Sequence, residues 1–307
     1  MKKIAVVGSL NVDLTVVLPR FHKPGETITG KDFATYTGGK GGNQAVAAAK
    51  LGVQTVMIGK LGCDQNGALY REVLEGLRID HAGVAAVKGV PSGVALIEVD
   101  ETGGDNRIAV VPGANHEVTA EYVSALLPTL LTCDMVLLQL EIPMETVIYV
   151  AQEMFAAGKC VVLDPAPAVP LPQELLASVS YLTPNETELH ILTGMPTGTQ
   201  EEVECAAKTL IAKGVGCVAA KLGARGAMLV TEGETTVVKG FAVQAVDTTA
   251  AGDSFNAGFA VALLDGEPPQ RAIRFANAVA AISTTSMGAQ GAMPSRRQVE
   301  DFLRAQN

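Results

Sequence analysis

Short apolar runs recur along the chain, and segments with helical spacing of apolar residues lie between them. The strand-like runs cover residues 4–10, 55–62, 135–141, 160–166, 218–223 and 227–232. Helical periodicity is found in 42–52, 65–77, 143–158 and 201–214, and in the C-terminal segments 251–266, 268–287 and 295–306. Runs this apolar are typical of strands covered on both faces. The alternation predicts right-handed βαβ units and a three-layer α/β/α fold around a mainly parallel central sheet.

Two stretches break this alternation. Residues 14–37 and 84–112 are rich in β-branched and turn residues and lack a helical period. We expect them to be β-segments inserted into a single domain, 1–307, and to pair into one small sheet. Such a sheet acts as a lid over a site, as a dimerisation surface, or as both. We predict that it covers the site, and that its second face, with alternate Val and Ile, forms a homodimer through the lid.

Composition narrows the classes of protein. Of the 307 residues 48% are hydrophobic, which is enough for a large core and excludes a disordered chain. Lys and Arg number 23 against 32 Asp and Glu, a net charge of −9 that argues against nucleic acid as a partner. No run reaches the roughly 18 apolar residues that predict a membrane helix. The five cysteines include no CxxC pair, which favours free thiols and a cytoplasmic location.

The first candidate site is the glycine-rich segment 37–52. Gly38, Gly39, Lys40, Gly41 and Gly42 precede Asn43 and a predicted helix. Consecutive glycines allow a ligand to approach the backbone closely, and a helix N-terminus offers unpaired N–H groups. A flexible turn is the alternative interpretation. The spacing matches neither a P-loop nor a dinucleotide fingerprint.

The second candidate site lies at 246–264, where Ala250, Ala251, Gly252 and Asp253 lead into a helix. We expect the amides of Ala251, Gly252 and Asp253 to point at one spot at the positive end of the helix dipole. Asp253 is either a charge that stabilises the helix or a base beside an anion hole. The second arrangement suits phosphoryl transfer, because the carboxylate accepts a hydroxyl proton while the amides stabilise the moving phosphoryl group.

Three motifs together resemble the ribokinase (PfkB) family of carbohydrate kinases. They are GGKGGNQAVAAAKLG near residue 40, PNETE at 184–188 and DTTAAGDSFNAGF near residue 250. The resemblance covers nearly the whole chain and implies a mainly parallel sheet with a small β-lid. It also implies an ATP-dependent kinase that phosphorylates the 5-hydroxyl of ribose. Alternatives are a kinase for another pentose such as deoxyribose, or for a nucleoside, and a non-catalytic sugar or nucleotide sensor.

The resemblance also implies residue roles. Asp253 is the catalytic base, and Ala250, Ala251 and Gly252 form the anion hole. The sugar ligands are Asn11, Asp13, Gly39, Lys40, Asn43 and Glu141. Asn185 and Glu188 hold Mg²⁺ and phosphate through water. The nucleotide lies along Lys221, Leu222, Gly223, Ala224, Arg225 and Gly226, with Asn277 beside the adenine. Asp247 and Thr249 bind K⁺, joined by Ser283 and Gly288.

Several of these residues have simpler interpretations. Asn185 is equally suited to capping a helix, and Asn11 and Asp13 to forming a turn. Lys40 alone resembles a solvated turn residue, and Glu141 an ordinary carboxylate at a strand end.

The chain also departs from the family pattern. Lys221 replaces a small hydroxyl residue, Asn277 replaces a histidine, and Gly42 replaces an alanine in what we interpret as a mild change. Lys221 either adds a phosphate contact or alters the nucleotide preference.

The substrate alternatives differ in what they require. A phosphorylated sugar needs an arginine cluster, which the candidate site lacks. A nucleoside needs an apolar or aromatic surface for its base, and aromatic residues are only 4% of this chain. Deoxyribose stays open, because it differs from ribose by one hydroxyl. A sensor has no need of Asp253, which favours an enzyme.

Overall fold

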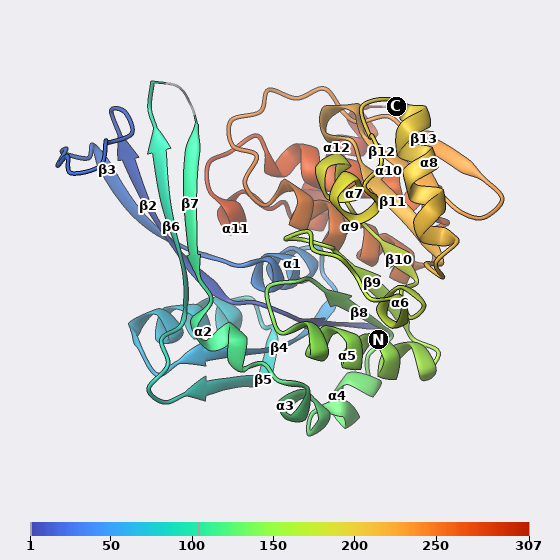
Figure 1. Cartoon of the computed structure of the whole chain (residues 1–307), viewed down its shortest axis with the longest axis horizontal. Helices are drawn as coiled ribbons and strands as arrows, with labels where there is room; N and C mark the ends of the chain where they lie inside the picture. Colours follow the sequence, from blue (N-terminus) through green and yellow to red (C-terminus); the bar gives the residue numbers. More distant parts are fainter. Residues whose placement is uncertain (1, 103–104, 307) are drawn as a thin grey trace.

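The computed structural model describes residues 2–102 and 105–306, and its main body is built on a nine-stranded sheet (Figure 1). The strand order is β13-β12-β11-β10-β9-β8-β1-β4-β5, and all neighbours are parallel except those involving β12 and β13. The strands are β1 Lys3–Val7, β4 Gln54–Gly62, β5 Asp80–Val87, β8 Met135–Leu138, β9 Cys160–Leu163, β10 Tyr181–Leu182, β11 Cys217–Lys221, β12 Ala227–Val230 and β13 Thr235–Val238.

Helices cover both faces of this sheet. They are α1 Lys40–Lys50, α2 Gln65–Gly76, α3 Ala120–Ser124, α4 Leu127–Leu131, α5 Met144–Ala156, α6 Gln173–Leu176, α7 Glu186–Thr193, α8 Gln200–Ile211, α9 Ala251–Asp265, α10 Pro269–Ser283, α11 Ala289–Ala292 and α12 Arg296–Ala305. Within the described ranges, none of them is long and apolar enough to cross a membrane.

Strand β1 shows why the fold has three layers. Its side chains alternate between two cores: Ala5 and Val7 belong to a buried cluster with residues of α5 and α8, and Ile4 and Val6 to another with residues of α1 and α9. All four are fully buried. A strand that is apolar on both faces needs helices on both sides. The predicted three-layer α/β/α fold is therefore confirmed.

The inserted segments form a separate four-stranded sheet in the order β3-β2-β6-β7. Its strands are β2 Asn11–Leu18, β3 Asp32–Gly38, β6 Gly93–Asp100 and β7 Asn106–Val111. The sheet extends away from the main body (Figure 1). The four-stranded sheet begins three residues earlier than the predicted segment 14–37, because β2 already starts at Asn11.

The prediction for 84–112 is wrong in its first part. Residues 84–87 belong to β5, which pairs in parallel with β4 at the edge of the main sheet. Strand β5 follows α2 after three residues and so completes a βαβ unit with β4. Only the later part of the segment, β6 and β7, joins the four-stranded sheet.

Helix α1 contains a glycine that the packing requires. A Cβ atom on Gly42 would lie 1.7 Å from the hydroxyl oxygen and 2.8 Å from Cζ of Tyr70. Tyr70 is fully buried, donates to the carbonyl of Gly38 at 2.6 Å and accepts from Gln290 Nε2 at 2.9 Å. Tyr70 therefore occupies the space that a side chain at position 42 would need. The interpretation of Gly42 as a mild replacement for alanine is wrong.

We predict that Gly42→Ala lowers the free energy of unfolding by roughly 1–3 kcal/mol, the usual effect of overpacking. The double variant Gly42→Ala with Tyr70→Phe should lose less free energy of unfolding than the sum of the two single losses. The reason is that phenylalanine lacks the hydroxyl that the new methyl group would meet. Urea denaturation measures all three variants. Gly76→Ala is the control, since its Cβ would meet no atom within 4 Å. Full additivity would show that the two residues do not compete for space.

Candidate active site

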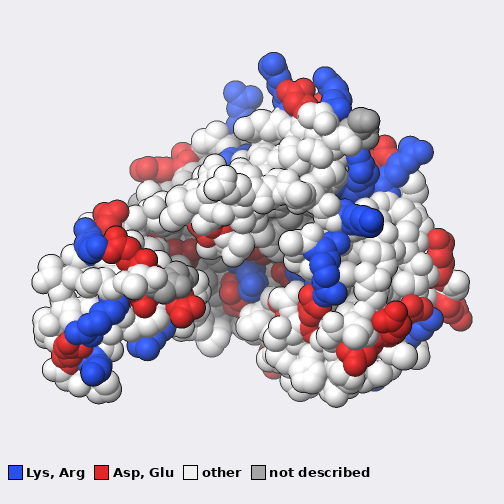
Figure 2. Space-filling view, turned by 90° about the horizontal axis from the view of Figure 1, so that it is seen from above, with Lys and Arg blue, Asp and Glu red and all other residues white. Residues whose placement is uncertain are grey.

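Five of the predicted residues converge at the first turns of α1 and α9; they are Asp13, Lys40, Asn43, Glu141 and Asp253. This is the side on which the strands of the parallel sheet end, as expected for the ligand side of an open α/β sheet. Figure 2 shows a hollow between the four-stranded sheet, on the left, and the main body, with acidic and basic side chains on its floor.

Asp253 is the third residue of α9 and is 6% exposed. Its carboxylate accepts hydrogen bonds from Asn43 Nδ2 at 2.9 Å and from Gln44 Nε2 at 3.1 Å, both from α1. Burial raises the pKa of Asp253 to about 6, with Lys40 opposing the shift and Asp164 adding to it. The group is therefore a fixed carboxylate with the proton affinity that suits a general base near neutral pH.

The start of α9 has an unusual backbone. Ala250 adopts the left-handed conformation with φ of 57°, which is costly for a residue with a side chain. The amide of Ala251 donates to the carbonyl of Thr248 at 3.2 Å. The prediction that the amides of Ala251, Gly252 and Asp253 point at one spot is therefore wrong for Ala251, whose amide closes the turn. The other two amides occupy the helix N-terminus, where the dipole favours an anion.

Asn11 and Asp13 lie in β2 rather than in a turn, so the turn interpretation is wrong. Asn11 accepts from Asn115 Nδ2 at 2.7 Å. Burial raises the pKa of Asp13 to about 7, and the nearby Glu141 and Asp253 add to the shift. A Cβ on Gly38 would lie 2.2 Å from the Asp13 carboxylate, so this side chain needs glycine opposite it.

Gly39, Lys40 and Glu141 complete this side of the site. Gly39 has φ of 79° and caps α1. Glu141 Oε2 accepts from the amide of Lys40 at 3.1 Å and from the hydroxyl of Ser9. Burial opposes the charge on Lys40, but the carboxylates of Asp253, Asp164, Glu141 and Glu188 raise its pKa above the ordinary value. Lys40 is thus a permanent cation that faces the acidic groups, not a solvated turn residue.

On the opposite side, Asn185 and Glu188 form a capping box for α7. Glu188 N donates to Asn185 Oδ1 at 2.8 Å, and Asn185 N donates to Glu188 Oε2 at 2.7 Å. The capping interpretation of Asn185 is confirmed, and its predicted contact with Mg²⁺ and phosphate stays a prediction. Burial raises the pKa of Glu188, while Lys221 opposes the shift.

The loop predicted to follow the nucleotide is a short 3₁₀ turn. Gly223, Ala224 and Arg225 form the turn, and the Leu222 amide donates to the carbonyl of Gly226 at 2.8 Å. Arg225 pairs with Glu186 at the start of α7. Asn277 is buried in α10, and its Nδ2 donates to the carbonyls of Val238 at 3.1 Å and Lys239 at 3.2 Å. Asn277 therefore joins α10 to the end of β13, and its place beside an adenine remains a prediction.

The predicted cation residues fall into two groups. Asp247 accepts from the amides of Thr249 and Gly288, both at 2.9 Å, and so joins two loops. Ser283 is buried in the last turn of α10, and its hydroxyl donates to the carbonyl of Ala280 at 2.8 Å. Asp247, Thr249 and Gly288 are therefore brought together, whereas the Ser283 side chain is engaged within its own helix.

The sequence interpretation missed buried residues that hydrogen-bond to Asp253 and Asn43 and hold them in place. Gln44 Nε2 bridges Asp253 and Asp164, at 3.1 Å from each carboxylate. Gln44 in turn accepts from Gln139 Nε2 at 2.7 Å. Gln290 contacts Asn43, Tyr70 and Thr37. Asp164 directly follows the apolar strand β9, so its position at a strand end was a usable signal; the glutamines had none.

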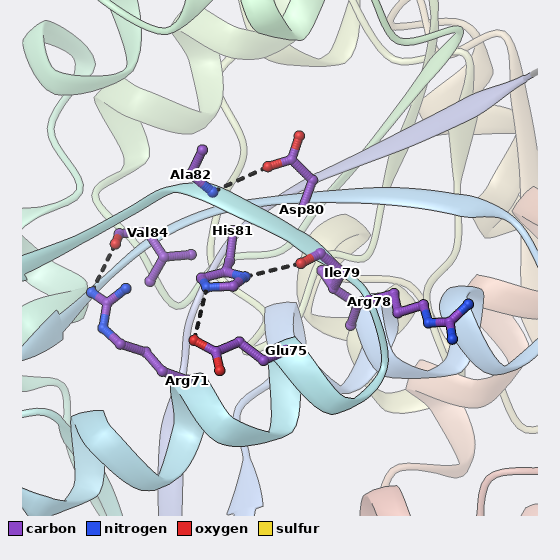
Figure 3. A pocket seen from close by; sticks show the side chains of 8 residues that line it. All are labelled: Arg71, Glu75, Arg78, Ile79, Asp80, His81, Ala82 and Val84. Atoms are coloured by element: carbon purple, nitrogen blue, oxygen red, sulfur yellow. Dashed lines mark hydrogen bonds and ion pairs between the residues drawn. The ribbon is translucent and has the colours of Figure 1, made fainter.

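A cavity of about 690 Å³ lies outside this site. It is lined by residues of α2, of β5 and of the link between them, including Arg71, Glu75 and His81 (Figure 3). Arg71 donates to the carbonyl of Val84 at 2.8 Å, and His81 contacts Glu75 and the carbonyl of Ile79. These polar groups are already paired, and none belongs to the candidate site.

A buried carboxylate at a helix N-terminus, beside glycine-rich loops at the ligand side of a mainly parallel sheet, is an arrangement suited to phosphoryl transfer. The model of the pfkB family of carbohydrate kinases matches residues 1–296, and the chain belongs to this family.

Individual relatives agree over nearly the full length. The chain is 43% identical to a ribokinase of Bacillus subtilis over 305 residues, which are 99% of this chain and 100% of the relative. It is 37% identical to a deoxyribokinase of Salmonella typhimurium over 98% of each chain. The structure of Arabidopsis thaliana ribokinase complexed with ribose and ATP superposes with a TM-score of 0.94 at 40% identity, covering 99% of each chain.

We predict that Asp253→Asn lowers kcat by roughly 10²–10⁴-fold, because an amide cannot accept the hydroxyl proton. Calorimetry should show that sugar binding is largely kept. In the parent enzyme the rate should fall as the pH drops through about 6, since the protonated Asp253 no longer acts as a base. Asp301→Asn on the exposed face of α12 is the matched control. Turnover of Asp253→Asn at the parent rate would contradict the assignment.

Proposed function

We propose that the chain transfers the γ-phosphoryl group of ATP to the 5-hydroxyl of ribose. The single observation that supports this most is the Asp253 carboxylate, buried at the N-terminus of α9 and held by two amide side chains of α1. The ribokinase relatives support the choice of ribose. The intact base favours an enzyme over a non-catalytic sensor.

Each group of residues has its own role in the proposed reaction. Asn11 and Asp13 bind the sugar hydroxyls, which both donate and accept hydrogen bonds. Asp253 takes the proton of the attacking sugar hydroxyl while the sugar oxygen forms the new bond to phosphorus. The N-terminus of α9 stabilises the negative charge of the phosphoryl group in transfer. Asn43 and Gln44 keep the acceptor oxygens of Asp253 in place.

The carboxylate oxygens of Glu188 and Asp247 are the kind of ligand that the two proposed metal ions, Mg²⁺ and K⁺, prefer. Only Oε2 of Glu188 takes part in the capping box and in the contact with Lys221, which leaves Oε1 for Mg²⁺ or its water shell. Among the described residues no group of three or more His, Cys, Asp or Glu could hold a metal without the phosphates. Mg²⁺ supplies charge neutralisation of the phosphates. For K⁺, Asp247 joins the two loops that would surround the ion.

Deoxyribose is the second candidate substrate, because a deoxyribokinase relative is 37% identical over nearly the full chain. The two sugars differ by one hydroxyl, and a site built to pair that hydroxyl rejects the analogue. The Asn11 and Asp13 side chains are the groups that would lose a partner.

An ADP-release assay with D-ribose, 2-deoxyribose and adenosine, each with and without K⁺, tests the proposed function. We expect the highest kcat/KM for ribose and a higher rate with K⁺. A higher value for deoxyribose or adenosine would reassign the substrate, and no ADP release with any of the three would contradict a kinase of this substrate class.

We also propose that the four-stranded sheet is a lid that forms a homodimer with the same sheet of a second copy, in the cytoplasm. Strand register places Leu14, Phe33, Leu96 and Val111 on the face opposite to Asp13, and the last three are exposed. An apolar face of this kind on a monomer is uncommon. The five free cysteines support a reducing compartment.

Leu96→Glu should shift the protein from dimer to monomer, because it places a charge at the centre of the proposed interface. Leu96 is 48% exposed. Phe155→Glu on α5 is the matched control, since Phe155 is 47% exposed on the main body. Sedimentation velocity measures both variants and the parent. A parent protein that is monomeric at micromolar concentration, or a dimer unaffected by Leu96→Glu, would refute the lid interface.

A further inference from the structure

The side chain of Lys221 crosses the floor of the candidate site. Its Nζ lies 2.8 Å from Asp164 Oδ1 and 3.9 Å from Glu188 Oε2, and the side chain is only 12% exposed. Lys221 comes from the end of β11, Asp164 follows β9, and Glu188 belongs to α7. Three separate elements thus fix one ammonium group, which distinguishes it from a solvated surface lysine.

The ammonium group also faces the start of α9. A Cβ atom placed on Gly252 would lie 3.6 Å from Lys221 Nζ, and no other atom outside its immediate neighbours would come within 4 Å. The space beside Gly252 is therefore bounded by the helix N-terminus on one side and by Lys221 on the other. An anion in that space meets a helix dipole and a full positive charge.

The site needs such a charge. Asp13, Glu141, Asp164, Glu188 and Asp253 are all acidic, and they oppose the entry of a nucleotide triphosphate. Lys40 is a second cation, which comes from α1 and lies near the same carboxylates. Lys221 is the first residue of the loop predicted to follow the nucleotide, and the other cation of that loop, Arg225, pairs with Glu186 at the start of α7.

We propose that Lys221 is a further catalytic residue, which contacts the phosphoryl group during transfer, and that Asp164 is the positioning residue that holds its ammonium group at the start of α9. This inference rests on the proposed kinase function and names the phosphoryl group as the ligand of this side chain.

In the transfer step, the bond from the sugar oxygen to phosphorus forms and the bond from phosphorus to the bridging oxygen of ADP breaks. The electron pair of the broken bond leaves with ADP, and the sugar proton goes to Asp253. Lys221 keeps its own proton throughout, because it acts only through its charge. Such a charge is most effective when it is fixed before the reaction begins.

A purely structural role for Lys221 makes a different prediction. Asp164 is 2% exposed, and without Lys221 its carboxylate would be a buried charge linked to Asp253 through Gln44. Lys221→Met therefore removes a cation and also leaves that carboxylate unpaired. The double variant Asp164→Asn with Lys221→Met removes both charges and separates the two explanations.

Steady-state kinetics of Lys221→Met, Lys221→Arg, Asp164→Asn and the double variant test the proposal. We expect Lys221→Met to lower kcat by roughly 10²-fold, with the KM for sugar nearly unchanged. Lys221→Arg should keep part of the rate, and the double variant should stay as slow as Lys221→Met. Lys208→Met, at an exposed ion pair on α8, is the control. A double variant that regains the parent kcat would overturn the catalytic role.

A binding measurement tests the same contact without depending on the sugar. Calorimetry with ADP and with AMP-PCP gives the preference of each variant for a nucleotide that carries the third phosphate. We expect the ratio of the affinities for AMP-PCP and ADP to fall at least tenfold in Lys221→Met and in the double variant. In Lys208→Met this ratio should be unchanged. An unchanged preference would overturn the phosphoryl contact. Because this readout needs no turnover, it still decides the role of Lys221 if ribose proves not to be the substrate.

Discussion

The burial of one carboxylate at a helix start organises the rest of the site. Asp253 has lost most of its water, and an ionised group in that position needs fixed donors. Asn43 and Gln44 supply them from α1, so the first turn of α1 must lie against the first turn of α9. That contact brings the glycine-rich loop before α1 into the site, and with it Lys40 and other proposed sugar ligands.

The same requirement explains the charges around Asp253. A second carboxylate, Asp164, shares the Gln44 amide and is compensated by Lys221. Lys40 faces both acidic groups from the other side. The two lysines therefore partly neutralise the cluster of carboxylates, so that the cluster is tolerated in a largely buried region. Removal of Lys221 leaves the Asp164 carboxylate without the cation that pairs with it.

Much of this was predictable from sequence because local patterns have local causes. All six apolar runs correspond to strands of the main sheet, since side chains buried on both faces must be apolar. The two-residue strand β10 was missed because it is too short to show a pattern, and β5 was assigned to the wrong sheet because its own residues do not specify its neighbour. The motifs placed Asp253 and Asp13 together, but Gln44, Asp164 and Gln290 depend on contacts between distant segments. Likewise, the need for glycine at position 42 comes from Tyr70, which approaches it from another helix.

The position of Asn11 and Asp13 in β2 couples these side chains to any movement of the four-stranded sheet. Asn11 and Asp13 belong to the same continuous strand that runs on to Leu18, and that strand pairs with β3 on one side and β6 on the other along its length. The four-stranded sheet therefore cannot tilt as a rigid body while these two side chains stay behind. Any pivot has to lie in the four links that join this sheet to the main body, which are before Asn11, after Gly38, before Gly93 and after Val111. Asn11 and Asp13, the proposed sugar ligands, lie at the end of the sheet nearest the pivot, so a small displacement of Asp13 is amplified at the far end of the sheet.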